Sequence, residues 1–383
     1  MDFSESPEIA DLRAAVGAIT GRFGGDYYAR KAEAREPVTE LWRALGEHGY
    51  IGINIPEEYG GGGAGLTELA VVCEESAAHG CPLLLMLVSS GVSGELITRF
   101  GTEEQRKTWL PRMASGEGKV VFAITEPDAG SNTHRLSTTA SRDGGGYLLR
   151  GQKHYISGVD EADAILVVAR TGTGGDGQAR LSLFIVDTGA PGLTAQPLPV
   201  SVTLPERQFA VYLDDVRVGA DRLVGSEGDG FSQVFHGLNP ERITGAALGV
   251  GIGRYALARA SAYASHRVVW DQPIGAHQAV AHALAAAKIE VELAALMTAR
   301  AAWLHDHGKP AGEAANMAKY AAAEASLAAV DAAIQSHGGN GLATEYGLMP
   351  LWGLARLLRI APVNREMILN YVAQHSLGLP RSY

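Results

Sequence analysis

The sequence predicts an α+β protein made of a helical block, a block of short strands and a second helical block, in that order. Three observations predict this class. The chain up to about residue 116 carries apolar side chains at spacings of three and four, which favours helices. The following stretch of roughly 100 residues holds short runs of β-branched and aromatic residues separated by turn residues. From Gly230 onward the chain is rich in alanine and again helical in pattern. Helices and strands that are segregated rather than alternating indicate α+β, not α/β.

Length, composition and charge are those of an ordinary globular protein. The chain has 383 residues, 46% of them apolar and 19% charged, so it can bury a large core in two or three domains. Its 32 basic and 42 acidic side chains give a net charge of −10. We expect no nucleic-acid partner, because phosphate binding at such an interface needs clustered Lys and Arg. A single buried Arg or a helix N-terminus can still bind an anionic ligand.

Cysteine usage and the chain start favour a cytoplasmic protein. Cys73 and Cys81 are expected to be reduced and buried, as is usual for cytosolic thiols. The N-terminus, Met-Asp-Phe-Ser-Glu-Ser, lacks the apolar region of a signal peptide. The longest apolar run, Leu83 to Val88, is too short to span a membrane. We therefore expect no membrane span.

The first block, residues 1–118, is expected to be a helical domain. Thr102 followed by Glu103, Glu104 and Gln105 is typical of a helix start, with a capping hydroxyl and acidic residues in the first turn. Helices are expected at Glu8–Ile19, Glu40–His48, Thr67–Ala78 and Thr102–Ala114, with a glycine-rich turn at Pro56–Gly65.

The second block, residues 119–228, is expected to form a sheet or barrel. Its runs are short and end at Gly, Pro, Asp or Thr, and Gly172 to Gly177 has the composition of a hairpin loop. Strands are expected at Val120–Thr125, Tyr147–Gly151, Ala164–Ala169, Leu181–Val186 and Phe209–Val218.

The third block, residues 229–383, is expected to be a helical bundle, because four long helical segments are joined by short loops. These segments are Pro240–His266, His277–Gly308, Gly312–Gly338 and Leu348–Gln374. Gly249, Gly251 and Gly253 have a spacing near that of a dinucleotide-binding loop. They lie inside a predicted helix and not after a strand, so close helix packing is the favoured interpretation.

Five segments carry polar and glycine residues that point to chemistry. Residues 122 to 132 read Phe-Ala-Ile-Thr-Glu-Pro-Asp-Ala-Gly-Ser-Asn, a strand ending in a hydroxyl-bearing turn. The others are Gly-Gln-Lys-His-Tyr-Ile-Ser-Gly at 151–158, Asn-Pro-Glu-Arg at 239–242, Arg267 with Gln278, and Gln-Ser-His-Gly-Gly-Asn-Gly at 335–341. In this order and spacing they resemble the acyl-CoA dehydrogenase family over essentially the whole chain. The resemblance implies an N-terminal helical domain, a middle β-barrel and a C-terminal four-helix bundle, with FAD between barrel and bundle.

The resemblance also assigns cofactor roles to individual residues. Backbone N–H groups and hydroxyls near the flavin ring stabilise negative charge on the reduced ring, and a guanidinium suits a pyrophosphate. Tyr155 and Ser157 could instead be barrel packing, and the glycines could simply end a helix. The flavin ring is expected at Phe122, Ile124, Thr125, Tyr155 and Ser157; the pyrophosphate of a neighbouring subunit's FAD at Arg267 and Gln278; the adenosine half at Gln335, Gly338 and Gly339; and the cofactor edge at Asn364 and Glu366.

Ser131, Asn239 and Arg242 are the residues that the resemblance places at the acyl-CoA substrate. Three positions depart from the family pattern. Val269 stands where relatives often have a phosphate-binding Thr, and Gly353 and Leu354 replace a usual Arg-Asp pair. These departures affect details of FAD binding only.

The catalytic base is not where most of the family has it. Removing the α-proton of an acyl thioester needs a carboxylate in a dry pocket, which raises its pKa. Relatives supply a Glu late in the bundle, where this chain has Pro362, which lacks both a carboxylate and an N–H. A subset that resembles isovaleryl- and long-chain acyl-CoA dehydrogenases has the base on the first bundle helix, before an Arg. That position is Glu241, before Arg242.

Two alternatives to this assignment stay open. Glu241 could be a first-turn helix charge, with Pro240 at the first helical position. Glu366 is a second candidate base, although it lies a turn past the family position. Ala361 stands where relatives often have a large aromatic residue, which could open room for a branched or bulky acyl chain. No metal site is expected, and His305 and His307 around Asp306 are interpreted as a turn.

The sequence therefore predicts an FAD-dependent acyl-CoA dehydrogenase that forms a 2,3-enoyl-CoA, with Glu241 as base. An electron-transfer flavoprotein is the expected electron acceptor. A homotetramer is the expected assembly, with a heterotetramer of related subunits as the alternative. Two rival functions are an acyl-CoA oxidase or flavin monooxygenase on the same fold, and a non-catalytic subunit whose partner carries the base.

Overall fold

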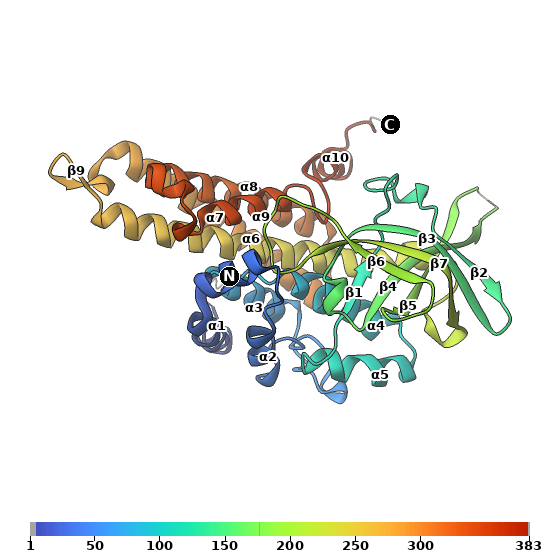
Figure 1. The fold of residues 1–383 in the computed structure, drawn as a ribbon. Coiled ribbons are helices and arrows are strands. Elements are labelled where there is room, and N and C mark those ends of the chain that lie inside the picture. Colours follow the sequence, from blue (N-terminus) through green and yellow to red (C-terminus); the bar gives the residue numbers. More distant parts are fainter. Residues whose placement is uncertain (1–4, 176, 382–383) are drawn as a thin grey trace.

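A computed structural model describes residues 5–175 and 177–381, and its elements follow the predicted order of helices, sheet and helices (Figure 1). The sheet lies at one end of the molecule and the long helices of the bundle extend away from it. Met1 to Ser4, on which much of the signal-peptide expectation rests, lie outside the described residues. Cys73 and Cys81 are free, buried thiols, as predicted. No helix in the described ranges is long and apolar enough to cross a membrane.

The N-terminal helices confirm the predicted segments and add two that periodicity did not indicate. Thr102 caps its helix as predicted, since its hydroxyl accepts from Gln105 N and Gln105 Oε1 accepts from Thr102 N. The π-helix η2 was missed because its residues, Met-Leu-Val-Ser-Ser-Gly-Val-Ser-Gly, do not follow the period of an α-helix. The helices are α1 (Pro7–Ala34), α2 (Thr39–Glu47), α3 (Leu66–Ala78), η2 (Met86–Gly94), α4 (Glu95–Phe100) and α5 (Glu103–Ala114).

The middle block forms one eight-stranded sheet with the order β6-β7-β3-β2-β4-β5-β8, to which β1 adds by pairing in parallel with β4. All five predicted strands are present, and the loop between β4 and β5 is the predicted hairpin, apart from residue 176, which is not described. The strands are β1 (Val120–Ala123), β2 (Thr139–Asp143), β3 (Gly146–Ser157), β4 (Ala164–Thr173), β5 (Ala179–Asp187), β6 (Leu193–Pro197), β7 (Gln208–Gly219) and β8 (Leu223–Val224).

The C-terminal block differs from prediction at two places. The first helix begins at Gly230, so Pro240 lies inside it and not at its first position. The fourth segment is two helices, interrupted by a connection that contains Pro362. The elements are α6 (Gly230–His266), the hairpin β9 (Val268–Val269) and β10 (Gln272–Pro273), α7 (Gln278–Asp306), α8 (Gly312–His337), α9 (Leu348–Leu358) and α10 (Arg365–His375).

Glycines of α6 let neighbouring segments approach closely, as predicted for the Gly249–Gly253 segment. A Cβ at Gly251 would lie 2.2 Å from the carbonyl oxygen of Glu74 in α3. A Cβ at Gly253 would lie 2.7 Å from Val291 in α7, and one at Gly249 would lie 3.2 Å from Ala322 O in α8. The contacts at Gly251 and Gly253 are closer than the 3.0 Å that real Cβ atoms keep, and the contact at Gly249 is tight, so these glycines serve packing and not dinucleotide binding.

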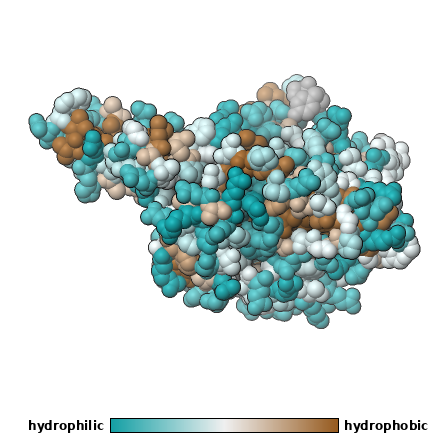
Figure 2. Space-filling view, in the orientation of Figure 1, coloured by the Kyte–Doolittle hydropathy of each residue, from teal (hydrophilic) through white to brown (hydrophobic). Residues whose placement is uncertain are grey.

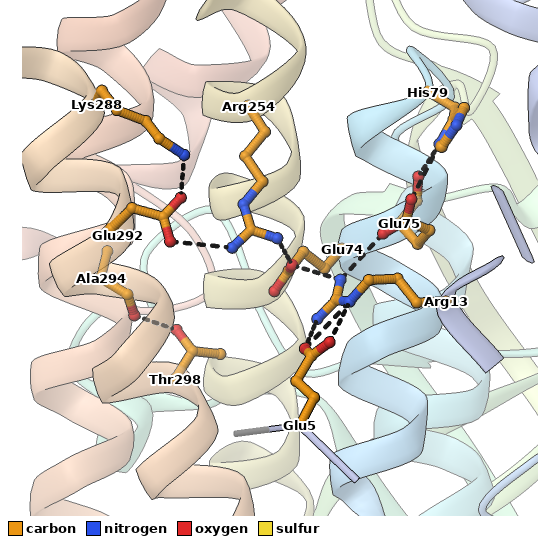
Figure 3. A network of polar contacts seen from close by, with 10 residues as sticks. All are labelled: Glu5, Arg13, Glu74, Glu75, His79, Arg254, Lys288, Glu292, Ala294 and Thr298. Carbon is orange, nitrogen blue, oxygen red and sulfur yellow. Dashed lines mark hydrogen bonds and ion pairs between the residues drawn. The ribbon is translucent and has the colours of Figure 1, made fainter. Parts of the chain in front are cut away.

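A chain of ion pairs joins the N-terminal block to the bundle (Figure 3). The buried carboxylate of Glu74 in α3 accepts a 2.7 Å hydrogen bond from Arg13 in α1 and a second hydrogen bond from Arg254 in α6. Arg254 also contacts Glu292 in α7 at 3.4 Å. The network therefore connects four helices through the carboxylates of Glu74 and Glu292. Burial raises the pKa of Glu74, and the two guanidinium groups offset only part of this effect.

The bundle ends in an arm that projects beyond the rest of the molecule, with apolar side chains exposed at its end (Figure 2). The β9–β10 hairpin lies there, and Trp270 in its turn is 82% exposed. At the other end of α7, Asp306 accepts hydrogen bonds of 2.8 and 2.9 Å from Leu66 N and Thr67 N. Asp306, which was interpreted from the sequence as part of a turn between His305 and His307, thus caps the start of α3.

Candidate active site

The end of β1 presents backbone and hydroxyl groups at the surface. Phe122 is buried in the strand, while Ile124 and Thr125, which follow it, are partly accessible. The carbonyl oxygen of Thr125 accepts a 2.9 Å hydrogen bond from His154 N in β3. The carbonyl oxygen of Ile124 accepts a 3.0 Å bond from Lys153 Nζ. Strand β3 therefore fixes the backbone where the sequence predicted the flavin ring.

A buried ion pair supports this strand end, and the sequence interpretation missed it. Lys153 Nζ lies 2.8 Å from Glu126 Oε1, and both side chains are fully or nearly fully buried. The carboxylate of Glu126 also accepts from Ser137 N, at 2.6 Å, and from Thr138 N, at 3.0 Å. Burial alone raises the pKa of Glu126, but Lys153 and these donors lower it to about 2. The Thr-Glu-Pro turn therefore owes its shape to the glutamate between the threonine and the proline.

Tyr155 and Ser157 lie on β3 beside this strand end. Tyr155 is 61% exposed and has a positive φ of 57°, a conformation that few tyrosines adopt. The alternative interpretation of Tyr155 as barrel packing is therefore wrong. Ser157 is partly buried and its hydroxyl exchanges hydrogen bonds with the side chain of Gln208 on β7, at 2.9 and 3.2 Å. An exposed aromatic ring next to accessible donors suits a flat ligand.

The π-helix η2 lies between β1 and α6 and connects the two halves of the candidate site. Val120 N, at the start of β1, donates a 3.3 Å bond to the hydroxyl of Ser89 in η2. On its other side, a Cβ at Gly91 would lie 3.2 Å from the hydroxyl of Thr244 in α6. Short π-helical segments are frequent at functional sites, because they shift side chains out of the regular helical register.

Glu241 is eleven residues past the start of α6 at Gly230, counting 241 − 230. It is therefore not in the first turn, and the alternative of a first-turn helix charge is wrong. Its side chain is partly accessible, yet its carboxylate forms no hydrogen bond or ion pair with any other described residue. Burial raises its pKa to about 7, against the opposing charges of Arg242 and Lys319. An accessible but unpaired carboxylate with this pKa is suited to taking up a proton.

Arg242 and Asn239 contact each other beside Glu241. Arg242 Nη1 donates a 2.9 Å bond to Asn239 Oδ1, while its buried Nε has no hydrogen-bond partner among the described residues. Burial lowers the pKa of the guanidinium, and Glu241 and Tyr371 raise it. The two residues that the sequence placed at the substrate are thus together, and one buried N–H of Arg242 is left without a partner among the described residues.

Lys319 of α8 is the second residue that sequence interpretation missed. It is 1% exposed, and its ammonium group donates to the carbonyl oxygens of Leu358 and Val363, the latter at 2.9 Å. Burial lowers its pKa to about 7, and Glu241 acts in the opposite direction. The available signal was a single lysine in an alanine-rich helix that is apolar on that side. Through these two hydrogen bonds Lys319 holds both ends of the connection that contains Pro362.

Ser131 and Asn364 are brought into direct contact. Asn364 Nδ2 donates a 2.7 Å bond to Ser131 Oγ, and Asn364 Oδ1 accepts from Met367 N and so caps α10. This bond joins the turn after β1 to the connection between α9 and α10. Glu366, in the first turn of α10, has a 73% exposed side chain. Such exposure does not favour Glu366 as the base, because the reaction needs a carboxylate in a dry pocket.

The remaining predicted residues lie at the far end of the bundle, where α6 and α8 end and α7 begins. There Tyr263 stacks on His337 with ring centroids 4.1 Å apart, and Asn340 Nδ2 donates to Tyr263 at 3.0 Å. Figure 1 shows this end, marked by β9, away from β1 and the sheet. A single chain therefore does not bring together its two groups of predicted cofactor-binding residues, one at the end of β1 and one at the far end of the bundle. The distant group is Arg267, Gln278, Gln335, Gly338 and Gly339, all of them exposed.

The residues present fit FAD when both groups are considered. The end of β1 offers accessible backbone, a hydroxyl and an exposed aromatic ring for a flavin ring. The far end offers an exposed guanidinium at Arg267, and Gly338 and Gly339, where an added Cβ would meet nothing within 4 Å. Such open glycines allow a ligand to approach the backbone closely. The distance between the two groups is accounted for if the far end of one copy serves the cofactor of another.

Comparisons with known proteins agree along the whole chain. Three family models match: acyl-CoA dehydrogenase N-terminal domain over residues 6–117, middle domain over 121–216 and C-terminal domain over 228–377. Acyl-CoA dehydrogenase FadE12 of Mycobacterium tuberculosis is 56% identical over 383 residues, which covers 100% of this chain and 99% of that protein.

Solved structures show the same fold. A glutaryl-coenzyme A dehydrogenase in complex with glutaryl-CoA superposes with a TM-score of 0.95 at 30% identity, covering 100% of this chain and 98% of that one. Butyryl-CoA dehydrogenase from Megasphaera elsdenii superposes with a TM-score of 0.93 at 27% identity, covering 99% of this chain and 100% of that one. The chain belongs to the acyl-CoA dehydrogenase family, with its three-domain fold, and is a flavin-dependent oxidoreductase whose cofactor is FAD.

Proposed function

We propose that the chain removes an α-proton and a β-hydride from an acyl-CoA thioester to form the 2,3-enoyl-CoA, with Glu241 as the base. One observation carries this proposal. Glu241 is only partly accessible as a residue, and its carboxylate is desolvated, forms no hydrogen bond or ion pair with other described residues and has a pKa of about 7. A base with a pKa near the working pH combines a sufficient deprotonated fraction with sufficient basicity.

The chain's own groups account for most of the reaction. Deprotonated Glu241 takes the α-proton and becomes a neutral acid. Negative charge then develops on the thioester oxygen and needs a donor. The N–H of Val363 is a candidate, because it forms no hydrogen bond within the described residues while Lys319 holds the carbonyl of the same residue. FAD, when bound, supplies the acceptor for the hydride.

The cofactor would be held by both ends of the chain. Phe122, Ile124, Thr125, Tyr155 and Ser157 would lie at the ring. Arg267, Gln278, Gln335, Gly338 and Gly339 would hold the pyrophosphate and adenosine of a neighbouring copy's FAD. We therefore favour a homotetramer. We further propose that it acts in the cytoplasm on acyl-CoA from fatty acid β-oxidation, and that an electron-transfer flavoprotein accepts the electrons of the reduced flavin. Ser131 would contact the acyl-CoA substrate, and Asn364, which is hydrogen-bonded to Ser131, would contact the edge of the FAD.

Anaerobic flavin bleaching by acyl-CoA thioesters tests the proposal. Glu241→Gln should lower the bleaching rate by roughly 10²- to 10⁴-fold, the usual contribution of a general base. Glu104→Gln is the matched control, because Glu104 is exposed on α5 and belongs to neither predicted group, and its flavin should be bleached as fast as that of the unmodified protein. Equal bleaching in Glu241→Gln would show that Glu241 is not the base.

Pro362 favours one other function, a non-catalytic subunit of a heterotetramer, since it removes the usual carboxylate. In that case the purified chain would bind FAD, but no acyl-CoA thioester would bleach the bound flavin. Admitting air after bleaching distinguishes the remaining rivals. Slow reoxidation is expected of a dehydrogenase, and fast reoxidation of an oxidase or monooxygenase.

A further inference from the structure

The proposed base is held only by its own backbone. The carboxylate of Glu241 forms no hydrogen bond or ion pair with any other described residue, and the charges of Arg242 and Lys319 act on it without a direct bond. The direction of this carboxylate therefore depends on the helical turn that carries it. Pro240 weakens that turn, because proline has no N–H and the helical bond to the carbonyl oxygen of His236 cannot form.

Thr244, one helical turn after Pro240, adds a bond to the same turn. Its side chain is fully buried, and its hydroxyl lies 2.9 Å from the carbonyl oxygen of Pro240 and 3.3 Å from that of Glu241. The hydroxyl donates to both oxygens, so it ties the backbone of the base to the next turn of α6. Threonine is a poorer helix former than alanine, which occupies the nearby positions 246 and 247, so helix stability does not account for it.

Thr244 also lies against the π-helix η2. A Cβ at Gly91 would lie 3.2 Å from the hydroxyl oxygen of Thr244 and 3.6 Å from its methyl group. Glycine at this position therefore lets the threonine side chain approach the backbone of η2. Two residues earlier in η2, the hydroxyl of Ser89 accepts from Val120 N at the start of β1. The turn that carries the base and the strand that leads to the predicted flavin residues thus rest on the same short stretch of η2.

We propose that Thr244 is a positioning residue for proton abstraction: its hydroxyl fixes the turn of α6 at Glu241, and its contact with Gly91 sets that turn relative to the end of β1. This inference rests on the proposed function of Glu241. Thr244 acts through the backbone of Glu241 and exchanges no proton with the substrate. A shift of about 1 Å in a reacting group can lower a rate roughly 100-fold. Loss of the hydroxyl should therefore slow proton transfer and not weaken thioester binding.

Thr298 of α7 offers a matched control. It is also buried, and its hydroxyl donates a 2.8 Å bond to the carbonyl oxygen of Ala294, four residues earlier (Figure 3). The bond is of the same kind as that from Thr244 to Pro240, but α7 contains no proline and carries no candidate base. Valine in place of either threonine keeps the size of the side chain and removes the hydroxyl. The carbonyl oxygens keep their helical N–H partners, so neither substitution leaves a buried group unpaired.

The test follows anaerobic flavin bleaching of the FAD-loaded variants over a range of concentrations of the acyl-CoA thioester that bleaches the unmodified protein fastest. Thr244→Val should lower the limiting bleaching rate roughly 10- to 100-fold. The half-saturating thioester concentration, the FAD content and the melting temperature should stay near those of the unmodified protein. Thr244→Ser keeps the hydroxyl and should recover most of the rate, and Thr298→Val should be bleached as fast as the unmodified protein. If Thr244→Val does not retain FAD, Thr244→Ala removes the same hydroxyl without added bulk and takes its place.

The pH dependence distinguishes positioning from a change in charge. The midpoint of the bleaching rate in Thr244→Val should stay at the pKa of Glu241, about 7, because no charged group is removed. An unchanged limiting rate in Thr244→Val, an equal loss in Thr298→Val, or no recovery in Thr244→Ser would overturn the role of Thr244. A loss confined to the half-saturating concentration, or a shifted midpoint, would overturn it as well. None of these outcomes bears on Glu241 as the base, which fails if Glu241→Gln is bleached as fast as the unmodified protein.

Discussion

The ammonium group of Lys319 donates a 2.9 Å hydrogen bond to the carbonyl oxygen of Val363, the residue after Pro362. A second bond goes to Leu358 O, so one buried lysine of α8 holds both ends of the segment that lacks the usual base. Lys319 also acts on Glu241, whose pKa it lowers against the effect of burial. The same side chain thus influences the position of the loop and the proton affinity of the candidate base.

Lys319→Met should shift the pH dependence of flavin bleaching. Glu241 must be deprotonated to act, so the rate rises with pH through its pKa of about 7. Removing a nearby positive charge raises that pKa, because a cation favours the carboxylate form. The acid limb should therefore move to higher pH, measured as the single-turnover bleaching rate from pH 5.5 to 9.

Lys319→Arg keeps the charge and should return the acid limb toward its original position, even if the loop shifts. Lys309→Met removes an exposed lysine near Trp303 and should leave the profile unchanged. A Lys319→Met profile with the original midpoint would mean that this lysine does not act on Glu241.

The order of blocks and the strand before Thr125 were predictable because both depend on local pattern. Alternating and helical periodicities identify elements from neighbours in the chain, and so does the capping box at Thr102. The close approach at Gly251 was also predictable, since glycine repeated at short spacing in an alanine-rich helix indicates packing. These features need no knowledge of which segments meet.

The missed features all depend on contacts between distant segments. Lys319 acts on Glu241 and holds the connection after Leu358 only because α8 packs beside them. Lys153 pairs with Glu126 only because β3 lies beside the turn after β1. The start of α6 was misplaced because Pro240 is typical of a first helical turn, whereas packing continues the helix through it from Gly230. Tertiary contacts overrode the local signal in each case.

Glu126→Gln should destabilise the strand end at neutral pH. It leaves Lys153, which is fully buried, without a charged partner, and breaking a buried pair in this way costs about 3–5 kcal/mol. Lys153→Met combined with Glu126→Gln should be more stable than Glu126→Gln alone, because the orphaned charge is gone. Thermal unfolding of the three apoproteins checks this, and additive losses in the double variant would contradict the coupling.

The same pair should make stability depend on acid. The pKa of Glu126 is about 2 in the folded protein, below the unfolded value of about 4.3. Its contribution is therefore fully present above about pH 4.3 and is lost as the pH falls toward 2. Melting temperatures between pH 6 and 3 should fall less steeply for Glu126→Gln than for the unmodified protein. If the melting temperatures of the two proteins fall equally steeply with decreasing pH, Glu126 does not contribute this acid-dependent stability.

Arg267→Ala should reduce FAD content without unfolding the chain. Arg267 is exposed at the end of α6, far from β1, so its loss removes little folding energy. If it reaches the pyrophosphate of a neighbouring copy's FAD, the ratio of flavin to protein absorbance should fall, and more so on dilution. Arg300→Ala, an exposed arginine near the other end of α7, should keep its flavin. Full flavin retention in Arg267→Ala would show that the far end of the bundle does not contribute to the cofactor site.

Gly251→Ala should be the most damaging single-methyl change in α6, because the new Cβ would lie 2.2 Å from the carbonyl oxygen of Glu74. That oxygen is backbone and cannot rotate away, so α3 and α6 must separate. Overpacking of this kind costs about 1–3 kcal/mol and sometimes more. Gly249→Ala, whose closest contact is 3.2 Å to Ala322 O, should cost less. Gly245→Ala should cost nothing, because its closest contact, Leu87 Cδ2 at 3.5 Å, is an ordinary van der Waals contact. The melting temperatures of the three variants should therefore rank in the order of these distances. A different order would mean that α6 shifts as a rigid body and does not pack residue by residue.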